Sequence, residues 1–268
     1  MSKDVLLGTI IGDIVGSRFE LVNNKYGKKF EFLHKYCRYT DDSVMTLAVA
    51  KAFLETKEDY SNLEEQVIKS MTEVGKKYPN CGYGPSFYRW IMSEDHKPYG
   101  SFGNGSAMRI SAVGVVAKSI DEIKKLSAIV TNVSHNHPDS INGSEATAVA
   151  IYMALKGKSK EEIKEYIEDN YFKIDDLKSD SMKPQYFHIN CVETVKQSIR
   201  AFLESTDYED AIRNAIALGG DSDTIGAITG SIASAYYGIP EDICNKALEY
   251  LDEYLIKIHA DFNEKYMR

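Results

Sequence analysis

The spacing of apolar residues in this 268-residue chain has the period of an α-helix wherever a period can be read. Apolar stripes with three- and four-residue spacing begin at Val44, Val67, Ile123, Val192, Ala211 and Ile243. Residues 146–155 are small or apolar on nearly all sides, which is typical of a helix in the middle of a bundle. Only the runs 5–11 and 112–117 could be strands, and both are too short to decide. The pattern predicts an all-α protein.

Nothing in the sequence divides the chain into separate units. There is no Pro/Ser-rich linker, low-complexity tract or internal repeat, and the six prolines fall between helical segments. A chain of this length can bury a sizeable core in one unit. We therefore expect one compact domain over residues 1–268.

The overall charge limits the classes of partner. Forty Asp and Glu against 32 Lys and Arg give a formal charge of -8. Nucleic acids and anionic membranes require a basic face, so neither is an expected partner, although a small anionic ligand is not excluded. The four cysteines have no zinc-ligand spacing, and we find no signal peptide or apolar span of about 20 residues. We expect reduced thiols and a cytoplasmic location.

Glycines recur four residues apart near the start of the chain, at Gly8, Gly12 and Gly16. Each costs a helix interior about 1 kcal/mol relative to alanine, so something must approach the backbone closely. One interpretation is tight helix packing. The other is a functional site, because Asp13 and Glu20 are unexpected among so many apolar neighbours.

The run Tyr-Thr-Asp-Asp-Ser at 39–43 directly precedes a helical stripe. Thr40, Asp41 and Asp42 could cap that helix, since its free N–H groups and dipole favour oxygen and negative charge. One such residue would suffice for capping. Adjacent carboxylates in a confined place also repel unless they share protons or a cation. Capping alone and a metal site both remain open here.

A second oxygen-rich helix start lies at 219–226, where Asp221, Asp223 and Thr224 precede a face of small residues. These side chains offer only oxygen, the donor that Mg²⁺, Mn²⁺ and Ca²⁺ prefer. The EF-hand loop pattern is absent. If this segment met the one at 39–43, six ligands would be available for two neighbouring ions.

A glycine-rich segment occupies residues 100–109. It lacks the Lys-Ser/Thr ending of a P-loop and the preceding strand of a dinucleotide fold, so alone it is a weak signal. It could still present backbone N–H groups to a phosphate. We expect Arg109 to pair with a carboxylate inside the protein.

Two histidines lie in the segment 134–139, which leads into a helix. His135 and His137 are two residues apart, so they cannot share a helix face. Contacts with a ligand and contacts with the backbone are both open, and Asp139 could simply cap the following helix.

Taken together and in this order, these segments resemble the ADP-ribosylglycohydrolase family, which includes dinitrogenase reductase-activating glycohydrolase and the ADP-ribosyl-acceptor hydrolases. The resemblance extends from Gly8 to about Gly238, and its matching runs are 12–20, 39–43, 103–109, 134–139 and 219–225. Where the family often has a proline shortly before its glutamate, this chain has Ser-Arg-Phe at 17–19. That departure leaves the branch of the family, and hence the acceptor, open.

The resemblance implies a single compact orthogonal helical bundle with two Mg²⁺ (or Mn²⁺) ions at the bottom of an ADP-ribose cleft. The implied metal ligands are Thr40, Asp41, Asp42, Asp221, Asp223 and Thr224. Glu20 matches a mobile glutamate that some branches place near the metals. The loop implied to hold the pyrophosphate and ribose comprises Gly100, Ser101, Phe102, Gly103, Asn104, Gly105 and Ser106. His135 would line the cleft.

The implied reaction is that of a metal-dependent, glycosylase-type hydrolase, which cleaves the bond between C1″ of ADP-ribose and an acceptor. Cleavage builds positive charge on the sugar, and a carboxylate activates water, with Glu20, Asp41 and Asp42 as candidates. The substrate would be an ADP-ribosylated protein or small molecule, linked through arginine as first choice, or through serine, an O-acetyl group or a free guanidino compound. A metal-dependent phosphoesterase acting on a nucleotide and a non-catalytic ADP-ribose-binding protein are the alternatives.

Aromatic residues close to the glycine-rich segment could select the acceptor or could belong to the core. They are Tyr83, Phe87, Tyr88, Trp90, Tyr99 and Phe102.

Overall fold

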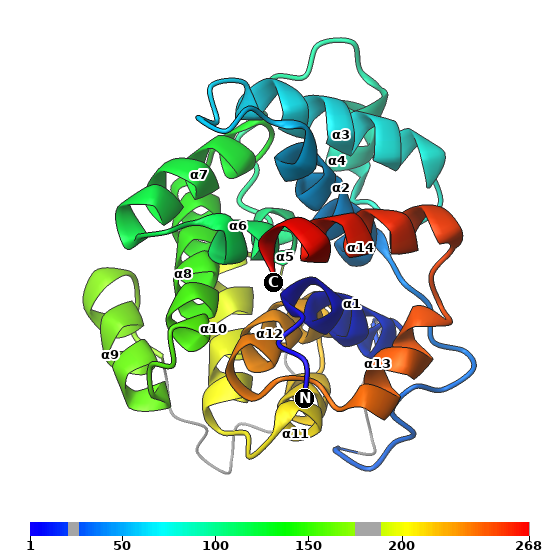
Figure 1. The fold of residues 1–268 in the computed structure, drawn as a ribbon, viewed down its shortest axis with the longest axis vertical. Coiled ribbons are helices and arrows are strands. Elements are labelled where there is room, and N and C mark those ends of the chain that lie inside the picture. Colours follow the sequence, from blue (N-terminus) through cyan, green and yellow to red (C-terminus); the bar gives the residue numbers. More distant parts are fainter. Residues whose placement is uncertain (21–26, 175–188, 268) are drawn as a thin grey trace.

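The computed structural model describes residues 1–20, 27–174 and 189–267, and within these ranges it contains 14 α-helices and no β-sheet (Figure 1). The helices are α1 (Val5–Gly16), α2 (Asp41–Glu55), α3 (Leu63–Lys77), α4 (Pro85–Met92), α5 (Gly105–Met108), α6 (Ser111–Val116), α7 (Ile120–Asn132), α8 (Pro138–Leu155), α9 (Lys160–Asn170), α10 (Cys191–Leu203), α11 (Tyr208–Leu218), α12 (Ser222–Tyr237), α13 (Glu241–Leu248) and α14 (Glu253–Tyr266). The predicted all-α bundle is confirmed.

Helices α1 and α12 form the centre of the bundle, and every residue of α1 is buried. Their backbones are in contact: a Cβ added at Gly226 would lie 2.5 Å from the carbonyl oxygen of Gly12, and one added at Gly8 would lie 2.6 Å from that of Gly230. The interpretation of the glycine repeat as tight helix packing is therefore confirmed.

The two runs of undecided type are helical. Residues 5–11 belong to α1, whose first turn is capped by Asp4, which accepts a hydrogen bond from the Leu7 N–H at 3.0 Å. Residues 112–117 fall largely in α6, where Gly114 lies against Ile151 of α8. A helix that is buried on all sides has no polar face, so its sequence shows no period from which its type could be read.

The remaining helices surround this pair in a way that places the site. Helix α2 contacts α1 and is covered by α3 and α14, while α8, α10 and α11 pack against α12 (Figure 1). As a result, the starts of α2 and α12 lie beside one another although 182 residues separate Asp42 from Thr224. None of the described helices has both the length and the apolarity of a membrane-spanning segment.

Candidate active site

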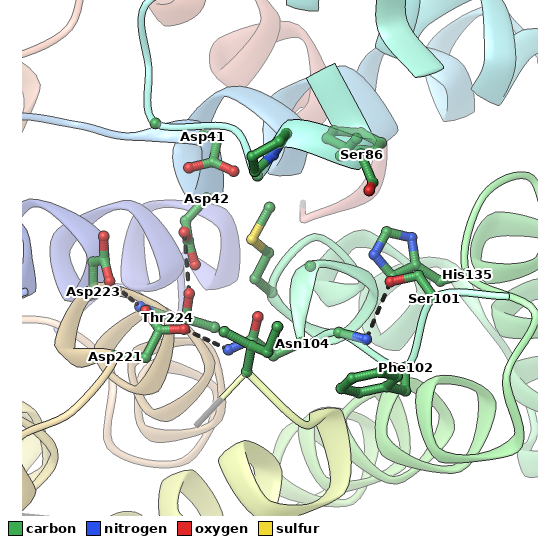
Figure 2. Close-up of a pocket in the computed structure, with 18 of the residues that line it drawn as sticks. Asp41, Asp42, Ser86, Ser101, Phe102, Asn104, His135, Asp221, Asp223 and Thr224 are labelled. Carbon is green, nitrogen blue, oxygen red and sulfur yellow. Dashed lines mark hydrogen bonds between the residues drawn. The ribbon is translucent and has the colours of Figure 1, made fainter. Parts of the chain in front are cut away.

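A cavity of about 610 Å³ opens beside the starts of α2 and α12. Acidic and hydroxyl side chains line one end of it, and the glycine-rich loop with His135 lines the other (Figure 2). The predicted site residues that line it are Glu20, Asp41, Asp42, Gly100, Ser101, Phe102, Gly103, Asn104, Gly105, His135, Asp221, Asp223 and Thr224. Two others, Thr40 and Ser106, are buried behind the lining residues.

A direct hydrogen bond joins the two oxygen-rich segments. The Thr224 hydroxyl donates to Oδ2 of Asp42 at 3.3 Å, and Thr40 caps α2 by accepting from the Asp42 N–H at 3.4 Å. Both capping and convergence therefore occur. The partial positive charge at the two helix starts favours carboxylates in these positions.

Asp13 was absent from the predicted ligand set, yet its carboxylate lies within the acidic end. One carboxylate oxygen from each of Asp13, Asp42 and Asp223 lies within 4.8 Å of the other two. Asp13 also holds the start of α2 in place, because it accepts from the Thr40 N–H at 2.8 Å, the Thr40 hydroxyl at 2.7 Å, the Ser43 N–H at 3.0 Å and the Ser43 hydroxyl. The signal in the sequence was a lone acid in an otherwise uncharged helix.

Burial raises the pKa values of all these carboxyl groups, and their mutual repulsion raises several of them further. The pKa of Asp41 rises to about 8 and that of Asp13 to about 6, in both cases mainly because water is excluded. Burial and then the neighbouring acids hold the pKa values of Asp42 and Asp223 well above the usual range. The pKa of Glu20 is raised by burial and by Asp221. Such a cluster gains stability from any cation that enters it.

The donor set fits hard divalent cations. Oδ1 of Asp42 is buried and has no hydrogen-bond partner among the described residues, so it retains its full capacity to bind an ion. A second group, Glu20, Asp221 and Asp223, has oxygens within 4.8 Å of one another and shares Asp223 with the first. Asp41 belongs to neither group, although it lines the cavity beside Gly82.

At the opposite end, the glycine-rich loop is fixed by backbone hydrogen bonds. The N–H of Asn104 donates to Ile189 and the N–H of Cys191 donates to Phe102, both at 2.9 Å, around a β-bridge between Gly103 and Asn190. The Ser106 hydroxyl supports the loop from behind by donating to the Gly103 carbonyl at 3.3 Å.

Asn104 links the two ends of the cavity. Its side-chain amide donates to Oδ2 of Asp221 at 2.6 Å (Figure 2) and to the Thr194 hydroxyl at 3.2 Å. Movement of the loop and movement of this acidic side chain are therefore connected by a hydrogen bond to a charged group, which is stronger than a neutral one.

The expectation that Arg109 pairs with a carboxylate is wrong. Its fully buried guanidinium donates to the Val130 carbonyl at 3.4 Å and to the Ser134 hydroxyl at 2.8 Å, and it lies over the ring of Phe87. The turn after α5 directs Arg109 toward the end of α7, where carbonyl and hydroxyl oxygens are the available acceptors among the described residues. Burial lowers the pKa of Arg109 to about 10.

The two histidines of the segment 134–139 have different roles. His135 is buried at the cavity wall, whereas His137 caps α8 by accepting from the Asp139 N–H at 3.1 Å. The cap is thus His137 and not Asp139, whose carboxylate accepts instead from the Asn190 side chain at 2.8 Å.

Only some of the aromatic residues near the glycine-rich loop line the cavity. Phe87, Tyr99 and Phe102 line the cavity, while Trp90 is buried and stacks on Phe87 at 5.5 Å. Tyr83 and Tyr88 are not part of the lining. Small residues before and at the start of α4 complete the wall, and the sequence offered no signal for them: Gly82, Gly84, Pro85 and Ser86.

Fold and site together define an all-α protein with a buried acidic cluster beside a glycine-rich loop. The sequence profile of the ADP-ribosylglycohydrolase family matches residues 2–266, and the chain belongs to this family. The resemblance inferred from the motifs is confirmed.

Similar proteins agree with this assignment. ADP-ribosylhydrolase ARH3 from Xenopus tropicalis is 26% identical over 303 residues, covering 87% of this chain and 86% of the relative. ADP-ribosylarginine hydrolase Tri1 from Pseudomonas putida (strain GB-1) is 24% identical over 277 residues, covering 89% of this chain and 71% of the relative. A solved structure named ADP-ribosylglycohydrolase-related protein complex has the same fold, with a TM-score of 0.72, 20% identity and coverage of 97% of this chain and 94% of that one.

Proposed function

We propose that this chain is a hydrolase that removes ADP-ribose from an acceptor by cleaving the C1″ bond at two Mg²⁺ or Mn²⁺ ions. The observation that carries the proposal is the presence of two sets of three acidic residues, which share Asp223, at one end of the cavity. The glycine-rich loop lies at the other end. The cavity volume of about 610 Å³ lies within the range of small-ligand sites. Family membership and the names of the relatives agree with it.

The residues that would hold the ions are Thr40, Asp41, Asp42, Asp221, Asp223 and Thr224, with Glu20 beside them. Bound there, the ions would supply positive charge that polarises ribose hydroxyls and acidifies a coordinated water. Asp13 supports this arrangement through Thr40, whose hydroxyl it already engages.

The loop contributes binding. The backbone N–H groups of Ser101 and Phe102 donate to no residue in the described ranges, so they are available to the oxygens of a pyrophosphate. The carboxylates contribute catalysis, because cleavage of a glycosidic bond places positive charge on the sugar ring. Glu20, Asp41 and Asp42 all line the cavity and are the candidates for taking the proton from water.

For the acceptor we propose arginine first, because one relative is named as an ADP-ribosylarginine hydrolase. Serine, O-acetyl and free guanidino acceptors are the other members of the test panel. The substrate would be an ADP-ribosylated protein or small molecule, and the product would be ADP-ribose. A cytoplasmic location and a single domain over 1–268 stay predictions.

The test combines metal depletion with product analysis. EDTA treatment is expected to abolish release of ADP-ribose from the panel, and Mg²⁺ or Mn²⁺ is expected to restore it. Full turnover by the metal-free protein would refute the metal-dependent mechanism. Formation of AMP would instead identify a phosphoesterase, and tight ADP-ribose binding without turnover of any substrate would identify a non-catalytic binding protein.

A further inference from the structure

A buried chain of hydrogen bonds runs from the protein interior to the cavity wall behind His135. Nη2 of Arg109 donates to Oγ of Ser134 at 2.8 Å, and Oγ of Ser134 lies 2.8 Å from Nδ1 of His135. Arg109 and Ser134 are completely buried, and His135 is 4% exposed. Water therefore has little access to these hydrogen bonds.

The direction of each hydrogen bond follows from the donors available. A guanidinium has only donors, so the Ser134 hydroxyl accepts from Arg109. That hydroxyl has one proton, and the only side-chain acceptor that faces it among the described residues is Nδ1 of His135. The arrangement that leaves no buried hydroxyl proton unpaired has Nδ1 unprotonated, and in a neutral imidazole the proton then resides on Nε2.

Nε2 faces the glycine-rich loop at the cavity wall. A Cβ added at Gly105 would lie 3.3 Å from it, and one added at Gly103 would lie 3.8 Å from it, so glycine at both positions keeps the space beside this nitrogen clear. Within the described parts of the chain no residue accepts a hydrogen bond from Nε2. The ring itself is held edge-on by Phe87 and Tyr99, with centroids 5.9 and 5.6 Å away.

We propose that Arg109 and Ser134 are positioning residues that hold His135 as its neutral Nε2–H tautomer, so that the cavity receives a fixed hydrogen-bond donor for a pyrophosphate or ribose oxygen. The identity of that ligand rests on the proposed function, whereas the tautomer does not. Burial and the nearby charge of Arg109 also hold the pKa of His135 well below its usual value, which keeps the ring neutral. The other groups that face the ring, Phe87 and Tyr99, carry no charge near neutral pH.

The tautomer can be determined directly by ¹⁵N NMR of the full-length, ligand-free protein that contains ¹⁵N-labelled histidine. The resonances of His135 are assigned by their loss in the His135→Gln variant. We expect a protonated Nε2 and an unprotonated Nδ1, unchanged between about pH 6 and 8. A protonated Nδ1, or an imidazolium at neutral pH, would overturn the proposal whether or not the protein hydrolyses any substrate.

Paired variants then test what the tautomer does. The amide nitrogen of glutamine reaches the position of Nε2, whereas that of asparagine lies near the position of Nδ1. In calorimetric titrations with ADP-ribose and Mg²⁺, His135→Gln should bind about tenfold more tightly than His135→Asn, as expected for one hydrogen bond to a charged group. Equal affinities would overturn the role of Nε2 as a donor.

The role of Ser134 is tested by a matched pair. Ser134→Thr keeps the hydroxyl and should retain the Nε2–H signature, whereas Ser134→Ala should lose the exclusive preference for it. An unchanged signature in folded Ser134→Ala would show that the hydroxyl does not set the tautomer. If Ser134→Ala does not fold, the spectrum of the unmodified protein still tests the tautomer, and the comparison of His135→Gln with His135→Asn still tests the role of Nε2 as a donor. If the unmodified protein binds no ADP-ribose, the proposed function fails while the NMR result stands by itself.

Discussion

The contact between α1 and α12 makes a sharp prediction for Gly226→Ala. The new Cβ would lie 2.5 Å from the carbonyl oxygen of Gly12 and 3.0 Å from its carbonyl carbon, well inside ordinary van der Waals contact. Backbone atoms cannot rotate away as side chains can, so the two central helices must separate. Overpacking of this kind costs about 3 kcal/mol, and the higher helix propensity of alanine offsets about 1 kcal/mol of it. We expect a net loss of about 2 kcal/mol in the free energy of unfolding.

The loss is measured by thermal and denaturant unfolding. For a chain of this size it corresponds to a decrease in Tm of about 4–8 °C. Gly84→Ala is the matched control, because no atom lies within 4 Å of the added Cβ and its φ of -56° suits alanine. We expect this control to unfold within about 0.5 kcal/mol of the original protein. If Gly226→Ala were as stable as Gly84→Ala, the helices would not be in backbone contact and the explanation of the glycine repeat would fail.

Three further predictions concern the acidic end of the cavity. The raised pKa of Asp41, about 8, means that the folded metal-free protein binds protons that the unfolded chain releases, so its free energy of unfolding should fall as pH rises from about 4 to 8. Melting curves without metal check this, and a Tm that increases over that range would contradict it. Added Mg²⁺ should raise Tm more at about pH 8 than at about pH 5, because protons compete with the ion at the lower pH. Asn104→Ala removes the hydrogen bond to Asp221 and should raise the Mg²⁺ concentration for half-maximal stabilisation about tenfold, whereas an unchanged midpoint would mean that this contact does not orient the acid. Asp13→Ala removes the acceptor for four donors at the start of α2 and should lower the free energy of unfolding by about 3 kcal/mol, and a loss below about 1 kcal/mol would show that those donors find other partners.

Much of the fold could be predicted from the sequence because the apolar residues of an amphipathic helix recur with the helical period. The stripes beginning at Val67 and Ile123, for example, lie in α3 and α7, which each have one polar and one buried face. The runs 5–11 and 112–117 could not be assigned, because α1 and α6 are buried almost throughout and carry no polar face from which a period could be read.

The site could be anticipated for a different reason. Adjacent acidic residues at a helix start, such as Asp41 and Asp42, indicate either a cap or, where they are confined together, a compensating charge. The same local logic failed for Arg109, because the partner of a buried cation depends on which acceptors the fold brings to it. Here they are an α7 carbonyl and the Ser134 hydroxyl rather than a carboxylate.

By itself, then, the sequence determined the helical class, the two oxygen-rich helix starts and the family they resemble, since each depends on residues that are close neighbours along the chain. The tertiary structure alone decided that the two starts meet, that Asp13 supports them and that His135 is backed by Arg109. Those contacts join segments separated by as many as 182 residues. The meeting of the two helix starts depends on how closely α1 and α12 pack, and no local pattern of residues predicts that distance.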